Sequence, residues 1–289
     1  MKRILSLSIL VALAGSVMAQ FNTSRVNLSI STLAPAVFND VGQMNLCGNV
    51  VSVKRTETRF DGTVPVTTTA TYLFDENGNK TERLVYNADG TTMETSYNNV
   101  YRNGLLYSVE VSGDATVCQT ITYRYDLSGN MIGHVNTCDT TPLVMTTTIF
   151  DRFRNPSLQR DHLTKEELTF TYQYDPTHPG NMLSRNRTRH NTISGESTLY
   201  ITSYAYDERG LLSQETTLCS DGTSSTTSYH YDMQGRLLCK DYMGAGLHRM
   251  EVYTRDEMGS CLDLAVREND RLVSHIECEV TYDSRVAMK

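Results

Sequence analysis

The sequence predicts an all-β protein, a continuous antiparallel meander of about nine hairpin repeats, each of about 25 residues, that forms a curved or spiralling sheet. Three observations support this prediction. A motif, Tyr-x-Tyr-Asp-x-x-Gly, recurs along the chain, and its glycines return at a nearly constant spacing. The composition, with 17 Tyr, no Trp and abundant Thr and Ser, is typical of strands, where aromatic and β-branched side chains pack on a pleated surface.

Copies of the motif follow one another through most of the chain. The complete copies span residues 123–129, 204–210 and 229–235, and weaker copies span residues 72–78 and 253–259. Lengthened, degenerate or unfinished copies begin at Tyr172, Tyr101, Phe150 and Tyr282. The turn glycines are Gly78, Gly104, Gly129, Gly180, Gly210, Gly235 and Gly259, so the steps are 26, 25, 51, 30, 25 and 24 residues, and the step of 51 covers two units. Two strands and two turns fit this period.

Each part of the motif has a local physical role. Residues two apart in a strand point to the same face, so the paired tyrosines should form aromatic ladders on the concave face of the sheet. Asp favours the first position of a type I turn, where its carboxylate accepts a backbone N–H, and Gly three residues later suits a left-handed conformation. We therefore interpret the recurring aspartates as turn formers and not as metal ligands or glycosidase carboxylates: Asp75, Asp126, Asp175, Asp207, Asp232, Asp256 and Asp283.

On these motif copies the chain resembles the YD-repeat, or Rhs-type, proteins over roughly residues 70–283. The resemblance implies repeats that build a spiralling β-sheet shell, often around a toxin or secreted cargo, and a surface or envelope location. Large Rhs proteins also carry a self-cleaving core segment and a variable C-terminal toxin. We expect neither here, because only residues 284–289 follow the last copy, so the toxin-delivery role is not expected to come with the fold.

The N-terminal residues predict export. Lys2 and Arg3 precede an apolar run over residues 4–14, and Val17 and Ala19 fit a cleavage site, so residues 1–19 are predicted to be a signal peptide. Residues 20–47 lack the motif and are predicted to be an N-terminal cap, and residues 48–289 form the predicted repeat array. No second apolar stretch follows, so we expect a mature chain without a membrane span, in the periplasm, at the cell surface or outside the cell.

Charge and motif content exclude several classes of function. Without Lys2 and Arg3 the chain has 24 basic and 33 acidic residues, a net charge near −9, which disfavours nucleic acid and anionic membrane surfaces as partners. The chain contains none of the metalloprotease, paired-cysteine, serine-hydrolase or phosphate-loop motifs, and its seven His show no ligand spacing. We therefore expect no cofactor and no metal.

The favoured interpretation is a non-catalytic structural or binding module of the cell envelope, whose Tyr-lined curved face contacts a glycan or a protein. The candidate binding residues are Arg185, Arg187, Arg189, Tyr204, Tyr206, Tyr229 and Tyr231. The arginines lie in an apparent insertion over residues 183–203, for which an overlong hairpin with a solvated basic face is the competing interpretation. The alternative function is a glycan-acting hydrolase with a site near this insertion, which a close group of carboxylates with a raised pKa would favour. Arginines that point into a concave pocket would favour an acidic ligand.

Seven cysteines lie in a chain expected to enter an oxidising compartment. Pairing across a regular hairpin places Cys118 opposite Cys138 and Cys261 opposite Cys278, which predicts two disulfides. The competing interpretation is that all are small buried hydrophobic residues. The remaining cysteines have no such partner: Cys219 and Cys239 should lie two strands apart, and Cys47 is left over.

Overall fold

The computed structural model describes residues 39–284, apart from residues 61, 63, 88, 114–118, 128, 139–140, 152–154 and 179. The predicted signal peptide and residues 20–38 of the predicted cap lie outside the described residues. The elements are α2 (Asp40–Gln43), β1 (Val50–Arg59), β2 (Val66–Phe74), β3 (Lys80–Tyr86), β4 (Thr92–Arg102), β5 (Leu105–Gly113), β6 (Gln119–Tyr125), β7 (Met131–Cys138), β8 (Thr141–Phe150), β9 (Pro156–Asp161), β10 (Glu166–Tyr174), β11 (Met182–Asn191), β12 (Ser197–Tyr206), β13 (Leu212–Cys219), β14 (Ser224–Tyr231), β15 (Leu237–Gly244), β16 (Leu247–Arg255), β17 (Cys261–Glu268) and β18 (Arg271–Tyr282).

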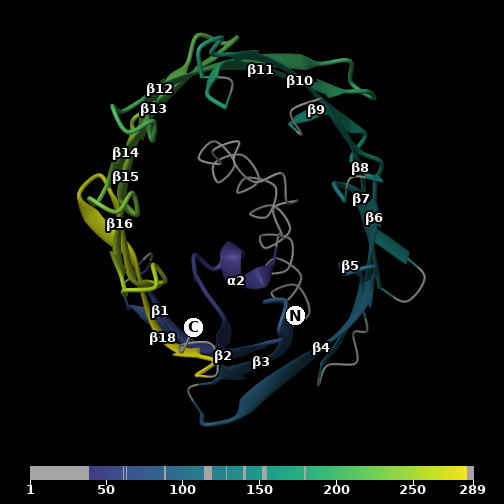
Figure 1. The fold of residues 1–289 in the computed structure, drawn as a ribbon, viewed down its shortest axis with the longest axis vertical. Helices are drawn as coiled ribbons and strands as arrows, with labels where there is room; N and C mark the ends of the chain where they lie inside the picture. The colour runs from purple at the N-terminus through teal and green to yellow at the C-terminus, as the bar shows by residue number, and fades with distance from the viewer. Residues whose placement is uncertain are drawn as a thin grey trace.

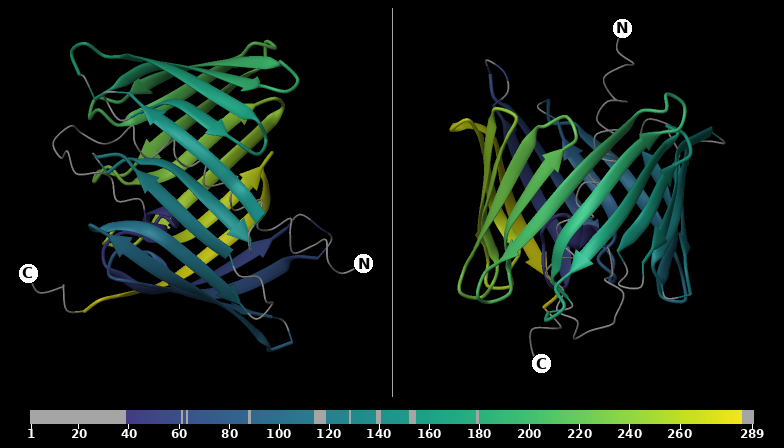
Figure 2. Two further views of the ribbon diagram at one scale, coloured as in Figure 1. Left: turned by 90° about the vertical axis from the view of Figure 1, so that its right-hand side faces the viewer. Right: turned by 90° about the horizontal axis from the view of Figure 1, so that it is seen from above.

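The 18 strands form one antiparallel sheet that closes on itself as a barrel. Each strand pairs with the next along the chain, and β18 pairs with β1 from Tyr282 opposite Val50 to Ser274 opposite Arg59. Figure 1 shows the resulting ring with α2 inside it, and Figure 2 shows the strands tilted across its wall. The predicted all-β antiparallel meander is confirmed, whereas the predicted curved or spiralling sheet is wrong, because the meander closes into a barrel. Closure pairs every strand on both edges, so it leaves no unpaired strand edge for aggregation.

The motif aspartate forms the turn, as predicted. The Asp207 carboxylate accepts the backbone N–H of Arg209 at 2.9 Å and that of Leu211 at 2.8 Å. Gly210 donates its N–H to the Asp207 carbonyl at 2.9 Å and has a φ of 77°, a conformation that a Cβ disfavours. The same bond from a backbone N–H to the motif carboxylate occurs at Asp75, Asp126, Asp175, Asp232 and Asp256.

Each motif hairpin also contains a β-bulge immediately before its second aromatic position. In β12–β13, Ala205 lies opposite Gln214 but Tyr206 lies opposite Leu212, so one extra residue stands in β13. Among the described residues, the same shift occurs in β2–β3, β4–β5, β6–β7, β8–β9, β10–β11, β14–β15 and β16–β17. A bulge bends its strand and increases the local twist, so a bulge repeated in every motif hairpin curves the sheet toward closure.

The bulges overturn the register on which the predicted disulfides depended. Cys138 lies opposite Gln119, and Cys118 lies outside the described residues. Cys278 lies opposite Arg55 of β1, and β17 and β18 pair with a register shift between Val266 and Arg267. The described cysteines are free thiols: Cys47, Cys138, Cys219, Cys239, Cys261 and Cys278. The predicted Cys261–Cys278 bridge is therefore absent, and Cys138 has no bridge, because a shift of one residue changes which side chains meet across the strands.

The register of the strand pairs also shows which side chains face the inside of the barrel and which face the outside. The buried side chain of Val41 on α2 belongs to one cluster with Val53 and Phe74, so these strand residues face the inside of the ring (Figure 1). Val53 lies opposite Tyr72 and Val280, and residues directly opposite share a face. Side chains alternate between the two faces along each strand, so the same reasoning assigns an inner or outer face to residues of the other strands. The first tyrosines of the motif copies face inward, as predicted for the concave face: Tyr72, Tyr123, Tyr172, Tyr204, Tyr229 and Tyr253.

A short segment, residues 39–49, which we call the strap, ties the strands on either side of the β1–β18 seam. At one end the Asp40 carboxylate lies 3.1 Å from Lys80 Nζ, and the Val41 N–H bonds to the carbonyl of Gly78 at 3.0 Å. At the other end the N–H of Cys47 donates to Ser260 Oγ at 2.8 Å. The strap thus joins the β2–β3 turn to the β16–β17 turn.

Candidate binding surface on the inner wall

Inward-facing arginines of β11 lie beside aromatic rings. Arg187 lies opposite Phe170 of β10 and Tyr200 of β12. Its guanidinium carbon is 4.2 Å from the centre of the Tyr200 ring, and that of Arg185 is 5.9 Å from the Tyr204 ring. Stacking on an aromatic face fixes the guanidinium plane and leaves its N–H edges free to bind an anion.

These arginines form a positive cluster with too few acidic partners. Arg189 pairs with Glu166 of β10, but Arg185 and Arg187 make no ion pair with any residue that the structure describes. The Nε atoms of Arg185 and Arg187 are buried and have no hydrogen-bond acceptor. Burial lowers the pKa of Arg187, and the neighbouring charges of Arg185 and Arg189 lower it further. Because an unsatisfied buried donor is costly, a hydrogen-bond acceptor close to these guanidinium groups would offset part of that cost.

The predicted tyrosines gather in one cluster. Tyr204 and Tyr229 are each 7% exposed and pack with Met182 and Leu212. Burial raises the pKa of both phenols, and the Tyr229 hydroxyl donates to Glu215 Oε2 at 2.7 Å. These rings form much of the apolar inner layer of the barrel, so their main contacts are with one another and with neighbouring strands.

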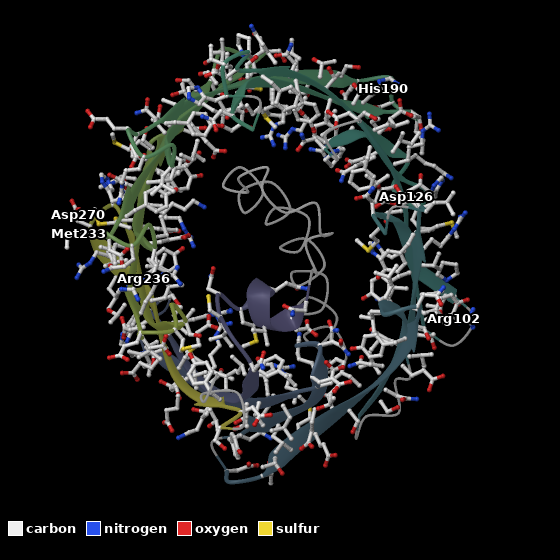
Figure 3. All side chains as sticks on the ribbon, viewed as in Figure 1. Arg102, Asp126, His190, Met233, Arg236 and Asp270 are labelled. Carbon is white, nitrogen blue, oxygen red and sulfur yellow. The ribbon has the colours of Figure 1, made fainter. Side chains whose placement is uncertain are left out.

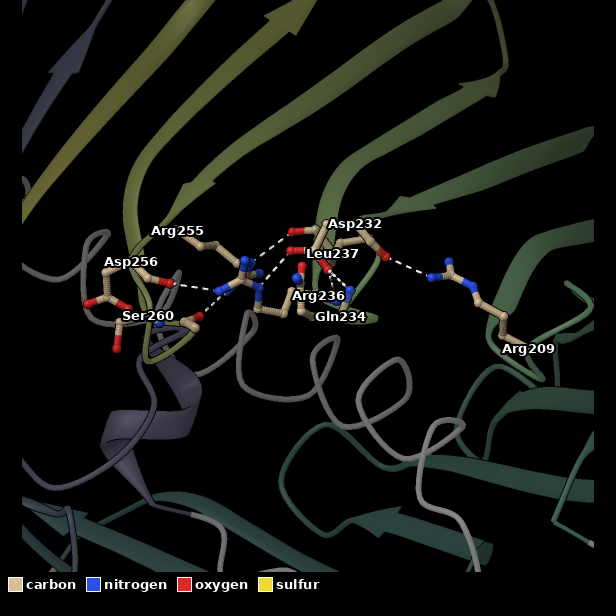
Figure 4. Close-up of polar contacts among 9 residues, drawn as sticks. Arg209, Asp232, Gln234, Arg236, Leu237, Arg255, Asp256 and Ser260 are labelled. Carbon is tan, nitrogen blue, oxygen red and sulfur yellow. Dashed lines mark hydrogen bonds and ion pairs between the residues drawn. The ribbon is translucent and has the colours of Figure 1, made fainter.

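The second tyrosine of the motif connects neighbouring repeats. The Tyr206 hydroxyl donates to the carbonyl of Met182 at 2.9 Å, and that of Tyr231 donates to the carbonyl of Leu212 at 2.9 Å. Arg255 replaces the second tyrosine in its copy and makes the equivalent bond, from Nε to the carbonyl of Leu237 at 2.8 Å (Figure 4). The contact therefore depends on a donor at this position and not on a phenol ring.

Arginines near the motif turns add a second set of links between repeats. Arg209 Nη1 donates to the carbonyl of Asp232 at 2.7 Å, and Arg236 Nη1 donates to that of Asp256 at 2.9 Å (Figure 4). Each arginine thus reaches the turn of the next unit. These hydrogen bonds connect motif turns that are separate in the sequence at the same end of the barrel.

The apparent insertion over residues 183–203 is an ordinary hairpin. Strands β11 and β12 pair from Ser184 opposite Ser203 to His190 opposite Ser197, so no separate loop domain is present there. The competing interpretation is right that the segment is a hairpin, but β11 and β12, with 10 residues each, are no longer than β1, β4 or β18. The basic side chains, however, face the inside of the barrel and not the outer surface. Tyr200 is not among the predicted binding residues, although its even spacing from Tyr204 places it on the same face of the strand.

Two described carboxylates near the arginines on the inner wall are already engaged by other side chains. Glu166 is paired with Arg189, and Glu215 accepts the hydroxyl of Tyr229. Among the described carboxyl groups with a shifted pKa, all are turn aspartates and all have lowered values: Asp89, Asp175, Asp207, Asp221 and Asp232. A glycosidase acid needs a raised pKa, so these groups give the alternative hydrolase no support.

The outer face carries ion pairs and also exposed apolar side chains, among them Ile149, Ile201 and Val252. Lys54 and Glu279 form an ion pair at 2.9 Å on opposite positions of β1 and β18, and Arg160 and Glu167 form one at 2.6 Å on β9 and β10. Figure 3 shows side chains on both sides of the wall, with Asp270 at the outer edge. No helix among the described residues is long and apolar enough to cross a membrane.

Comparison with known proteins finds likeness only at low identity. No protein-family model and no curated protein sequence matches the chain. A porin-like protein from Bacteroides uniformis is 12% identical over 80% of this chain and 96% of its own, with a TM-score of 0.40. A porin-like protein from Bacteroides vulgatus is 13% identical over 81% of this chain and 98% of its own, with a TM-score of 0.35.

A second kind of solved structure also resembles the chain. The Tc holotoxin pore of Photorhabdus luminescens is 14% identical over 72% of this chain, with a TM-score of 0.32, and the match spans 15% of that chain. At these TM-scores neither likeness argues for a shared function. The resemblance to YD-repeat proteins rests on the motif copies, and no family model confirms it.

Proposed function

We propose that this protein is a non-catalytic, exported β-barrel that binds an acidic glycan on its inner wall. The observation that carries the proposal is the inward-facing pair Arg185 and Arg187, each positioned over a tyrosine ring and without acidic partners among the described residues. Guanidinium groups bind carboxylate and sulfate groups through paired N–H bonds. Tyrosine rings beside them offer apolar area for the C–H face of a sugar.

The geometry supports a ligand inside the barrel. The arginines lie on strand positions whose side chains face inward, and an 18-stranded barrel is wide enough to enclose an aqueous channel. The chain as a whole is negative, with 26 basic and 33 acidic residues, so a local positive cluster is the favoured point of contact for an anion. Binding should weaken as salt rises, because charge attraction contributes to it.

The outer face supports an aqueous setting around the barrel. A lysine or arginine on the lipid face of a membrane barrel costs about 2–4 kcal/mol at the bilayer midplane. Here Lys54 occupies an outward position in the middle of β1, and Arg160 an outward position one residue before the end of β9. We therefore propose that the barrel lies in the periplasm, at the cell surface or outside the cell, where these outward charges can contact water.

Glycan titration of the purified chain tests this function. We expect polygalacturonate or a sulfated glycan to bind, and a neutral glycan such as dextran to bind at least about tenfold more weakly, because the charged bonds contribute about 1.5–3 kcal/mol each. Arg185→Gln with Arg187→Gln should remove this preference. The matched control is Arg160→Gln, which removes an outward arginine and should leave binding unchanged.

Three results would overturn the proposal. The first is equal binding of acidic and neutral glycans. The second is unchanged binding in the double arginine variant when circular dichroism shows a folded barrel. The third is tighter binding of polyglutamate than of the acidic glycans, which would assign the surface to an acidic polypeptide partner.

A further inference from the structure

An imidazole and two carboxylates converge on the outer face of β17 and β18. Asp263 lies directly opposite Glu277, and His275 stands two residues before Glu277 on the same face of β18. One donor atom from each side chain lies within 4.8 Å of the other two. His275 Nε2 is 2.6 Å from Asp263 Oδ2. The three donors are thus held by two adjacent, regularly paired strands.

The charges of this group are not balanced by nearby cations. Two carboxylates directly opposite each other on neighbouring strands repel, which destabilises the sheet locally. Neither Asp263 nor Glu277 forms an ion pair with a lysine or arginine in the part of the chain that the structure describes. Lys54, on the same outer face, is paired with Glu279 at 2.9 Å. A bound cation would offset the repulsion between the two carboxylates.

A second His–Asp pair on the outer face provides an internal comparison. His248 Nε2 lies 2.8 Å from Asp241 Oδ1, and both side chains are exposed to a similar degree as those of His275 and Asp263. Two residues after His248, however, the strand carries Met250 where β18 carries Glu277. The third donor, and not the His–Asp contact, distinguishes the group on β17 and β18.

We propose that Asp263, His275 and Glu277 bind one divalent transition-metal ion, and that Zn²⁺ fits best. One imidazole nitrogen and two carboxylate oxygens are ligands that Zn²⁺ accepts, and three protein ligands leave a position for water. Mg²⁺ and Ca²⁺ prefer oxygen ligands alone. Because the donors come from β17 and β18, the ion joins two strands next to the β1–β18 seam and should raise the stability of the closed barrel.

Calorimetric titration with Zn²⁺ tests the site, on the full chain purified without a histidine tag and freed of metal with EDTA. We expect one ion per chain. His275→Gln and Glu277→Gln should each weaken binding by at least about tenfold, whereas His248→Gln should bind like the wild type. Absence of Zn²⁺ binding, wild-type affinity in both site variants, or equal affinity for Mg²⁺ would overturn the proposal.

Thermal unfolding separates metal binding from a general structural role. Zn²⁺ should raise the Tm of the wild type and of His248→Gln, because a ligand that binds only the folded state stabilises it. Glu277→Gln should lose this rise. In EDTA the same variant should be at least as stable as the wild type, since it removes the opposing carboxylate. An equal Zn²⁺-induced rise in Glu277→Gln would contradict the assignment.

Discussion

Asp283 donates its backbone N–H to the carbonyl oxygen of Asn49 at 3.0 Å, although the two residues lie near opposite ends of the described chain. Within the first motif turn, Asp75 makes the same bond to Asn79 at 2.9 Å. Gly48, with a φ of 77°, precedes Asn49 as the motif glycine precedes Asn79. The ninth repeat is therefore assembled from both ends of the chain: β18 supplies its first strand and β1 its return strand.

Arg55→Cys should form a disulfide with Cys278 across this seam. Arg55 lies directly opposite Cys278, and opposite positions bring Cβ atoms to about 4.5–5.5 Å, near disulfide reach. Mild oxidation should give an intrachain bridge, seen as faster migration on a non-reducing gel and as joined peptides by mass spectrometry. Glu57→Cys, opposite Ile276, is the matched control and should not react with Cys278. A folded Arg55→Cys variant that forms no disulfide would contradict the pairing of β1 with β18.

Tyr206→Phe should destabilise the barrel by about 2 kcal/mol, because each lost hydrogen bond contributes about 1 kcal/mol. The Tyr206 hydroxyl accepts the N–H of Met182 at 3.0 Å and donates to the Met182 carbonyl at 2.9 Å. Denaturant unfolding measures the change. Tyr86→Phe removes a hydroxyl that makes only one exposed contact, 3.3 Å from Thr71 Oγ1, and should stay within about 0.5 kcal/mol of the wild type. Equal stability of the two variants would show that the hydrogen bonds between Tyr206 and Met182 contribute nothing to the free energy of unfolding.

Ser260→Ala should loosen the strap at Cys47, while the bond from the Cys261 N–H to the Asn45 carbonyl remains. The Ser260 hydroxyl is fully buried; it accepts the N–H of Cys47 at 2.8 Å and the hydroxyl of Tyr282 at 2.6 Å. Its removal leaves a buried N–H unpaired, at a cost of about 1–3 kcal/mol. Hydrogen exchange at the Cys47 amide should accelerate, while exposed Ser224→Ala should leave it unchanged. Unaltered protection at Cys47 in the Ser260 variant would contradict this role of the strap.

Thr177→Val should raise the pKa of Asp175. The Thr177 hydroxyl donates to the Asp175 carboxylate at 2.6 Å and its N–H donates at 2.7 Å, and these bonds lower that pKa to about 2. A carboxyl whose pKa is lower in the folded than in the unfolded state stabilises the fold above the unfolded pKa of about 3.9. This contribution disappears as the pH falls from about 4 to about 2.

Carbon NMR titration of the Asp175 carboxyl measures this shift directly. In Thr177→Val the pKa should move toward its ordinary value of about 3.9, and the loss of stability on acidification should become smaller. Thr188→Val, in β11 and away from this turn, is the control and should leave the Asp175 pKa unchanged. An unshifted Asp175 in Thr177→Val would show that the hydroxyl bond does not set its pKa.

Local physics made much of the fold predictable. The spacing of two tyrosines, as in Tyr204 and Tyr206, fixes a shared face because side chains alternate along a strand. The turn role of Asp207 follows from the short reach of its carboxylate to nearby N–H groups. The sequence also predicted the candidate arginines, but that their side chains face the inside of the barrel depends on the register with Phe170 and Tyr200 and on the side toward which the sheet closes.

The sequence by itself determined that the chain is an antiparallel meander with aspartate-capped turns and inward tyrosines, because these features depend on residues within one hairpin. Only the tertiary structure decided that the meander closes, since closure depends on strand number, tilt and stagger summed over the whole sheet. The tertiary structure also decided which residues lie opposite the cysteines. The bulge before Tyr125 places Cys138 opposite Gln119, and a hairpin register counted from the turn alone does not include that extra residue.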